Sequence, residues 1–140
     1  MCIFKKKPVV SPEKIKPTSS EKIRLAEIAS LLKNYEPMAQ IIMADNWKYL
    51  CSYNDTALFL IQDETNKMEY KPEEYDCDDF TFRLKGQFSI PLWSNLALGI
   101  CWTTTHALNC FISEGKKVLF IEPQTDEIKS FVEGIKLFIM

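Results

Sequence analysis

The sequence HALNCFISEGKKVLFIEPQ, residues 106–124, contains the pattern that most clearly predicts how this chain folds. Two apolar-rich segments, 106–112 and 117–122, flank a polar turn at Glu114-Gly115, which is typical of a β-hairpin. If the loop around Gly115 has an odd number of residues, His106 lies opposite Glu122 or Gln124, with all three on one side of the sheet. A two- or four-residue loop would instead put His106 and Glu122 on opposite faces.

A helix start is predicted upstream, in the sequence DCDDFTFRLKG at residues 76–86. Asp76 suits the N-cap, further acidic residues suit the first turn, and Gly86 suits the C-terminal stop. Cys77 would lie in the first turn, where free backbone N–H groups favour a thiolate and can stabilise an oxyanion. Taken alone, a cysteine at such a position is more often a small apolar filler.

The remaining segments predict a mixed α and β domain. A capping-box spacing at Thr18 and Glu21 introduces an amphipathic helix that ends at Glu36-Pro37. The other expected elements are a short helix within 38–53, strands at 56–61 and 96–102, and a terminal helix at 127–139, either intact or broken near Gly134.

Length and composition predict one domain over residues 19–140, after an extended basic and proline-containing leader at 1–18. The apolar runs are too short for a membrane span, and the start does not resemble a secretory signal. A net charge of −2 argues against a nucleic-acid surface; Lys5–Lys7 are either a solvated tail or a contact for an anionic surface. Five cysteines without a CxxC pair indicate free thiols in a reducing, cytoplasmic compartment.

Three residues have the chemistry of a nucleophilic site. Cys77 would be the nucleophile and His106, the only histidine, the general base. Pro123 favours an extended Glu122, whose carboxylate could orient the imidazole. The alternatives are a hydrogen-bonded structural histidine and an ordinary solvated strand-end glutamate.

The negative charges of the acidic residues around Cys77 disfavour a thiolate, and a cation bound among them would instead favour it. Oxygen donors that suit a hard ion such as Ca²⁺ or Mn²⁺ come from Asp78 and Asp79 at the helix start and from Glu122, Gln124 and Asp126. The alternative is that these acids cap the helix and face water.

The motifs YDCDDF (75–80), HALN (106–109) and IEPQ (121–124) together resemble the papain-like cysteine protease domain of the Marasmius oreades agglutinin family and its phage and bacterial relatives. The resemblance covers about residues 75–125. It implies an α+β papain-like fold, with N-terminal helices and a nucleophile helix packed on a small antiparallel sheet. It also implies a Cys77–His106–Glu122 triad and Ca²⁺ or Mn²⁺ held by Asp78, Glu122 and Gln124, with Asn109 as a further contact. The chain has no sugar-binding repeat, so lectin activity is not carried over, and Lys71 stands where such enzymes often have an oxyanion-hole glutamine.

The expected function is that of a small metal-dependent cysteine peptidase acting on a peptide or protein, in a bacterial or phage-infected cell or on a virion. One alternative is a catalytically silent binding or virion-structural module on the same scaffold, docked to a protein partner through its N-terminal leader and helix. Another is an amidase or transglutaminase-like acyl-transfer enzyme.

Overall fold

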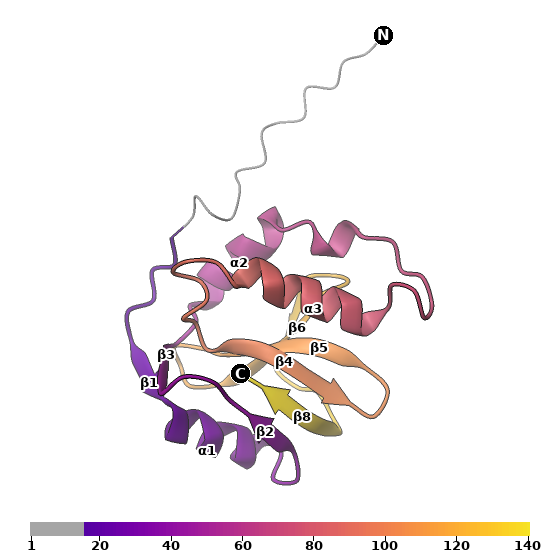
Figure 1. The fold of residues 1–140 in the computed structure, drawn as a ribbon. Coiled ribbons are helices and arrows are strands. Elements are labelled where there is room, and N and C mark those ends of the chain that lie inside the picture. The colour runs from indigo at the N-terminus through magenta and orange to yellow at the C-terminus, as the bar shows by residue number, and fades with distance from the viewer. Residues whose placement is uncertain (1–15) are drawn as a thin grey trace.

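The computed structural model describes residues 16–140, in which a six-stranded sheet has helices on both faces (Figure 1). The strands lie in the order β2-β8-β4-β5-β6-β7, and every neighbouring pair is antiparallel except β2 and β8. Their bounds are β2 Gln40–Ile42, β4 Leu98–Thr103, β5 Ala107–Ile112, β6 Val118–Glu122, β7 Glu127–Lys129 and β8 Ile135–Ile139. Most of the predicted leader, with Lys5–Lys7, lies outside the described residues.

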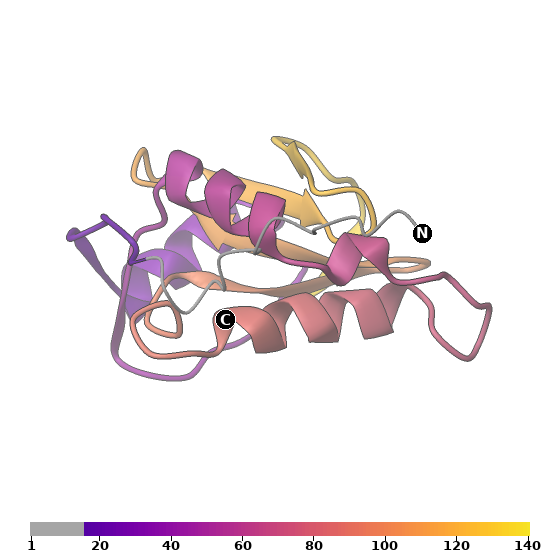
Figure 2. The same cartoon turned by 90° about the horizontal axis from the view of Figure 1, so that it is seen from above.

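The side chains of the sheet alternate between two apolar cores. On one face, Cys110 of β5 packs in a cluster with Ile28 and Leu32 of α1 (Leu25–Tyr35). On the other face, Phe111 packs with Phe59 of α2 (Tyr53–Gln62) and with Leu84 of α3 (Cys77–Phe88). A 3₁₀ turn, η2 (Thr65–Lys67), follows α2 (Figure 2).

A separate antiparallel ribbon is formed by β1 (Lys22–Arg24) and β3 (Trp47–Tyr49). The central residue of each strand is buried, whereas the flanking residues are more open: Ile23 is 1% exposed and Lys48 4%. Because side chains alternate along a strand, the outer face of the ribbon carries Lys22, Arg24, Trp47 and Tyr49.

The predicted hairpin is confirmed, and its register is the one that favours a site. Asn109 pairs with Ile121 and Ile112 with Val118, which leaves a five-residue loop, 113–117. This odd loop puts positions 106, 122 and 124 on one side of the ladder.

Several predicted elements are wrong. Residues 56–61, expected as a strand, lie in α2, whose N-cap Ser52 accepts a hydrogen bond from the backbone N–H of Asp55 at 3.2 Å. The helix expected within 38–53 is replaced by β2 and β3, and the terminal helix by β7 and β8. Short apolar runs fit either structure, so the partner strands decided these segments.

The N-terminal helix begins later than the capping-box spacing indicated. Residues 22–24 belong to β1 and α1 starts at Leu25. Thr18 caps no helix of its own and instead bonds to α2, since its backbone N–H and its Oγ1 donate to Asp55 Oδ2 at 2.6 and 2.9 Å. Across residues 16–140, none of the helices combines the length and apolar character that a membrane crossing requires.

Candidate functional site

Cys77 occupies the first turn of α3, as predicted. The backbone N–H of the N-cap, Asp76, donates to Asp79 Oδ2 at 3.1 Å, so the predicted helix start is confirmed. Cys77 is half-buried, whereas Cys51, Cys101 and Cys110 are buried in the cores. Among the described cysteines, Cys77 is therefore the one that a solute can reach.

The packing of α3 on β5 sets which end of the sheet Cys77 faces. Asn109 Nδ2 donates to the carbonyl of Thr81 at 3.1 Å, and Lys85 Nζ donates to the carbonyl of Leu98, which pairs with Phe111. Moving four residues along α3 therefore corresponds to moving two residues along β5, because four helical residues and two strand residues each span about 6 Å. One turn before Thr81, Cys77 lies near the level of Ala107, at the end where β5 begins. Figures 1 and 2 both show the start of α3 and the β4–β5 turn at the same end of the molecule.

His106 and Glu122 are in direct contact across the hairpin. His106 Nε2 lies 2.6 Å from Glu122 Oε2, with side-chain exposures of 35% and 12%. The backbone of His106 is fixed by Thr103, whose Oγ1 accepts the His106 N–H at 3.0 Å. Burial raises the pKa of Glu122, but the hydrogen bond and charge of His106 outweigh it and leave that pKa below its usual range. The geometry therefore holds a carboxylate against the imidazole.

The acids around Cys77 interact chiefly with one another. Ligand atoms of Asp76, Cys77 and Asp78 lie within 4.8 Å of each other. A hydrogen bond to Asp76 raises the pKa of Asp78, with smaller contributions from burial and from the nearby negative charges. The largest influence on Asp78 is therefore its neighbour Asp76.

The described contacts do not gather the oxygen donors that the resemblance implied for a metal. Asp79 is used by the helix cap, Glu122 holds His106, and the buried amide of Asn109 donates to Thr81 and Gly99 beneath α3. The backbone N–H of Gln124 bonds to Glu122 Oε1 at 3.4 Å. A metal at Asp78, Asp79, Asn109, Glu122 and Gln124 stays a prediction.

A second candidate site, which the sequence analysis did not predict, lies on the β1–β3 ribbon. A hollow of about 360 Å³ is lined by Lys22, Arg24, Asn46 and Trp47, and an adjoining one of about 300 Å³ by Asp45, Asn46, Trp47 and Asn95. We call the two together the Trp47 hollow. Trp47 is 40% exposed and Lys22 Nζ lies 4.1 Å from its ring centroid.

Three chain segments hold the Trp47 hollow in shape through backbone hydrogen bonds. The N–H of Leu25 donates to the carbonyl of Asn46 at 3.0 Å, and the N–H of Tyr49 donates to the carbonyl of Asn95 at 2.8 Å. Asp45 has a left-handed backbone, with φ of 67°, and its carboxylate lies 3.3 Å from Lys48 Nζ. The alternation of Lys22-Ile23-Arg24 is typical of a strand, but Trp47-Lys48-Tyr49 buries its lysine and leaves its aromatic residues more open, so the sequence pattern by itself does not show the ribbon.

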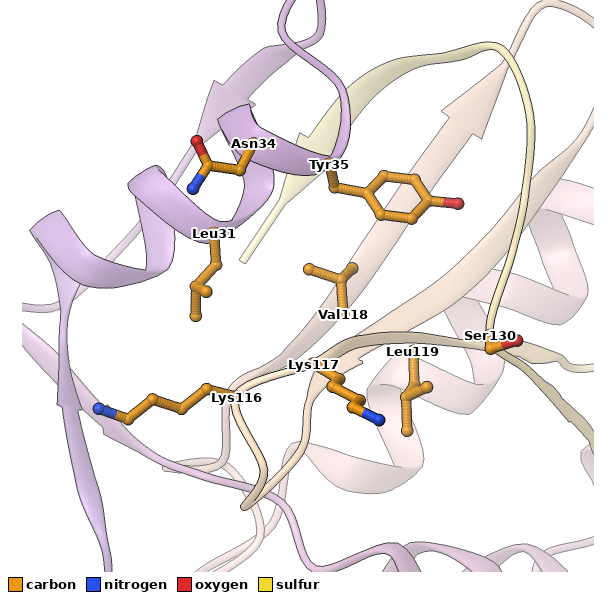
Figure 3. Close-up of a pocket in the computed structure, with 8 residues that line it drawn as sticks. All are labelled: Leu31, Asn34, Tyr35, Lys116, Lys117, Val118, Leu119 and Ser130. Atoms are coloured by element: carbon orange, nitrogen blue, oxygen red, sulfur yellow. The ribbon is translucent and has the colours of Figure 1, made fainter.

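A further hollow of about 350 Å³ lies between α1 and the start of β6. Figure 3 shows Leu31, Asn34 and Tyr35 of α1 on one side and Lys116 and Val118 on the other. Lys116 Nζ also pairs with Glu27 of α1 at 2.5 Å. This hollow is the seam along which α1 packs against the hairpin.

Comparison with known proteins identifies the fold but no family. No family model matches the sequence, and no curated protein matches it either. Among solved structures, a complex of PSL1a, a Polyporus squamosus lectin, with E64 is similar at a TM-score of 0.73 and 18% identity, over 85% of this chain and 51% of that one. Polyporus squamosus lectin bound to Neu5Acα2-6Galβ1-4GlcNAc gives a TM-score of 0.74 and 18% identity, over 85% and 49%.

These neighbours correct the expectation of a papain-like cysteine protease fold. The agglutinin side of the resemblance is confirmed at the level of fold, whereas the papain-like assignment is wrong, and the expected hydrolase class loses its support with it. The physical reason is that much of the chain expected to be helical forms strands of a sheet-rich domain. The chain spans about half the length of each lectin, and its sheet-rich fold with three short helices matches the β-rich fold of those structures.

Proposed function

We propose that this chain is a binding module that recognises a glycan in the Trp47 hollow. The observation that carries the proposal is the exposed Trp47 ring bordered by the side chains of Asp45, Asn46 and Asn95. The C–H face of a sugar packs against an aromatic ring, and its hydroxyl groups form hydrogen bonds with nearby carboxylate or amide groups. Because the fold match takes in half of each lectin, the glycan assignment rests on this hollow and not on the neighbours' names.

The charges beside Trp47 favour an acidic sugar. Lys22 and Arg24 line the same hollow, and Lys22 lies against the ring. A carboxylate-bearing glycan would gain charge-assisted hydrogen bonds there, which are stronger than neutral ones. A Polyporus squamosus lectin was solved with a glycan of this class, the sialylated trisaccharide Neu5Acα2-6Galβ1-4GlcNAc.

The test is titration of the chain with that trisaccharide and with its form lacking the sialic acid, followed by NMR or calorimetry. We expect binding of the sialylated form, loss of at least about tenfold in affinity in Trp47→Ala, and a smaller loss in Lys22→Gln. Tyr70→Ala is the matched control, because Tyr70 is an aromatic residue 50% exposed elsewhere on the surface. Equal affinity in Trp47→Ala and Tyr70→Ala, or no binding of either sugar, would reject the proposal.

A second candidate function is acyl transfer through Cys77, of the transglutaminase-like kind. The specific observation is the 2.6 Å His106–Glu122 contact at the end of β5 that the start of α3 faces. In such a reaction the thiolate attacks an amide carbonyl, and the imidazolium gives its proton to the leaving amine. A second amine then attacks the thioester, gives a proton to the imidazole and releases the Cys77 thiolate. PSL1a was solved as a complex with E64, which makes E64 a suitable probe for this chain.

Mass spectrometry after incubation with E64 separates the two candidates. Acyl-transfer chemistry predicts an adduct on Cys77, formed more slowly in His106→Ala, while Cys51, Cys101 and Cys110, the buried cysteines of the described residues, stay unmodified. A purely binding module predicts that Cys77 reacts no faster in the native chain than in the unfolded one.

A further inference from the structure

A cluster of buried oxygen atoms lies at the end of α2 and in the β6–β7 turn that follows Glu122. In the described residues, eight buried side-chain polar atoms have no hydrogen-bond partner. Five of these are oxygens of residues 62–66 and 126, namely Gln62 Oε1, Asp63 Oδ1, Thr65 Oγ1, Asn66 Oδ1 and Asp126 Oδ1. Buried polar atoms are normally satisfied, so five acceptor-type oxygens in two short segments require an explanation.

The burial of these residues excludes bulk water as a general answer. Asp63 is 2% exposed and Thr65 is fully buried. Asp63 uses its other oxygen, Oδ2, to accept the backbone N–H of Thr65 at 2.8 Å, which fixes the carboxylate and leaves Oδ1 without a donor. An ionised carboxylate with one orphaned, buried oxygen is costly unless a positive charge lies nearby.

The turn between β6 and β7 brings a second carboxylate to the same place. Asp126 has a left-handed backbone, with φ of 63°, and its N–H donates to the carbonyl of Glu122 at 2.9 Å. Burial raises the pKa of Asp126 to about 6, and the negative charge of Asp63 contributes to that rise. Figures 1 and 2 both place the β6–β7 turn beside the segment that contains η2. The repulsion between these two carboxylates favours either a proton or a bound cation.

We propose that the end of α2, η2 and the β6–β7 turn form a Ca²⁺ site, in which Asp63 and Asp126 supply carboxylate oxygens and Gln62 and Asn66 supply amide oxygens. Thr65 Oγ1 adds a neutral oxygen. An all-oxygen set with two negative charges is the donor chemistry that Ca²⁺ prefers over softer ions. Asp126 is the one member of this site that the sequence analysis also named as an oxygen donor for a hard ion. The site goes beyond the proposed glycan binding.

Protonation is the competing explanation for the same oxygens. A proton on Asp126 would remove one of the two negative charges. The buried Tyr75 hydroxyl also lacks a hydrogen-bond partner, and the negative charge of Asp63 contributes to raising its pKa. The charge of Lys67 lowers the pKa of Asp126. The Lys67 ammonium is nevertheless exposed and lies 3.8 Å from the Glu64 carboxylate, so it does not fill the cluster of buried oxygens. A proton satisfies one oxygen, whereas a cation satisfies several at once.

A cation bound at this site would also restrain the hairpin that carries His106 and Glu122. The Asp126 N–H is bonded to the Glu122 carbonyl, and the Glu122 side chain contacts His106. A cation bound between η2 and Asp126 would therefore tie the turn that follows Glu122 to α2.

The test uses the full chain, stripped with a chelator and then titrated with Ca²⁺ by calorimetry and by thermal melting. We expect one Ca²⁺ bound with a dissociation constant below about 1 mM, and a melting temperature that rises with Ca²⁺. Asp126→Asn should weaken binding by at least about tenfold, while Glu64→Gln, an exposed acid inside the same segment, should leave it unchanged. Asp78→Asn should also leave it unchanged.

Three results would overturn the proposal. The first is no heat of binding and no rise in melting temperature up to about 10 mM Ca²⁺. The second is unaltered Ca²⁺ binding in Asp126→Asn. The third is loss of binding in Asp78→Asn, which would place the ion at the start of α3. Asp126 is only partly buried and sits in a turn, so its variant is expected to fold; circular dichroism checks this before titration.

Discussion

The His106 imidazole and the Glu122 carboxylate form a contact in which burial and hydrogen bonding act in opposite directions. Burial alone would raise the pKa of Glu122, and the 2.6 Å contact reverses that effect. The Glu122 carboxylate is therefore ionised in the folded protein at pH values where an exposed glutamate begins to take up a proton.

The pH dependence of stability follows from this lowered pKa. Glu122 contributes stability above its ordinary pKa of 4.5, and the contribution is lost as the pH falls through the lower folded value. We expect Glu122→Gln to cost about 1 kcal/mol near neutral pH and to have a smaller loss of stability on acidification than wild type. Urea unfolding at neutral and acid pH, in chelator, measures both.

Glu127→Gln is the matched control, because Glu127 is an exposed acid on the neighbouring strand. An acid-induced loss of stability as large in Glu122→Gln as in wild type would contradict the prediction.

At the scale of elements, two glycines have opposite roles although each lies within a regular element. A Cβ added at Gly99 of β4 would lie 2.0 Å from the Ile139 carbonyl oxygen of the adjacent strand β8, whereas a Cβ at Gly86 of α3 would meet nothing within 4 Å. Gly86 does not end α3 as the sequence indicated, since the helix continues to Phe88. The close approach of the β4 and β8 backbones therefore explains why position 99 requires a glycine, whereas no such contact requires one at position 86.

This contrast predicts opposite effects of the same substitution. Gly99→Ala should lower the free energy of unfolding by about 1–3 kcal/mol, because β4 and β8 must separate. Gly86→Ala should raise it by about 0.5–1 kcal/mol, because alanine loses less backbone entropy in a helix. Chemical denaturation of the two variants beside wild type tests both, and a destabilised Gly86→Ala would show that α3 needs the glycine.

At the scale of the whole molecule, one aromatic cluster joins both helices on its face to the chain that leads into β4. The rings of Phe59 in α2 and Phe88 in α3 are stacked with centroids 3.8 Å apart, and Trp93 lies 4.7 Å from Phe59. All three are buried. The cluster thus fixes α2 against α3, and with them η2 and the start of the Cys77 helix.

We expect Phe59→Ala to lower the free energy of unfolding by about 3–5 kcal/mol, since it removes the central ring of this cluster. Leu58→Ala, at the adjacent position, should change it by less than about 0.5 kcal/mol because Leu58 is 43% exposed. Thermal or urea unfolding gives both values. Similar losses in the two variants would mean that the cluster is not what holds α2 in place.

The sequence by itself determined the parts of this protein that depend on local chemistry. The acids around Cys77 specify a helix start, and the two apolar-rich segments around Gly115 specify a hairpin. Both features need only residues close together in the chain, or two strands joined by a short loop. The length of the hairpin loop, which places His106 and Glu122 on one side, was left open by the sequence and decided by the strand pairing.

Only the tertiary structure decided the segments whose patterns are ambiguous. Residues 56–61 became helical and 135–139 became a strand between β2 and β4, because short apolar runs adopt the state that their neighbours can satisfy. The Trp47 hollow and the oxygens of Asp63 and Asp126 likewise arise from segments far apart in sequence. Packing, and not local preference, assembled them.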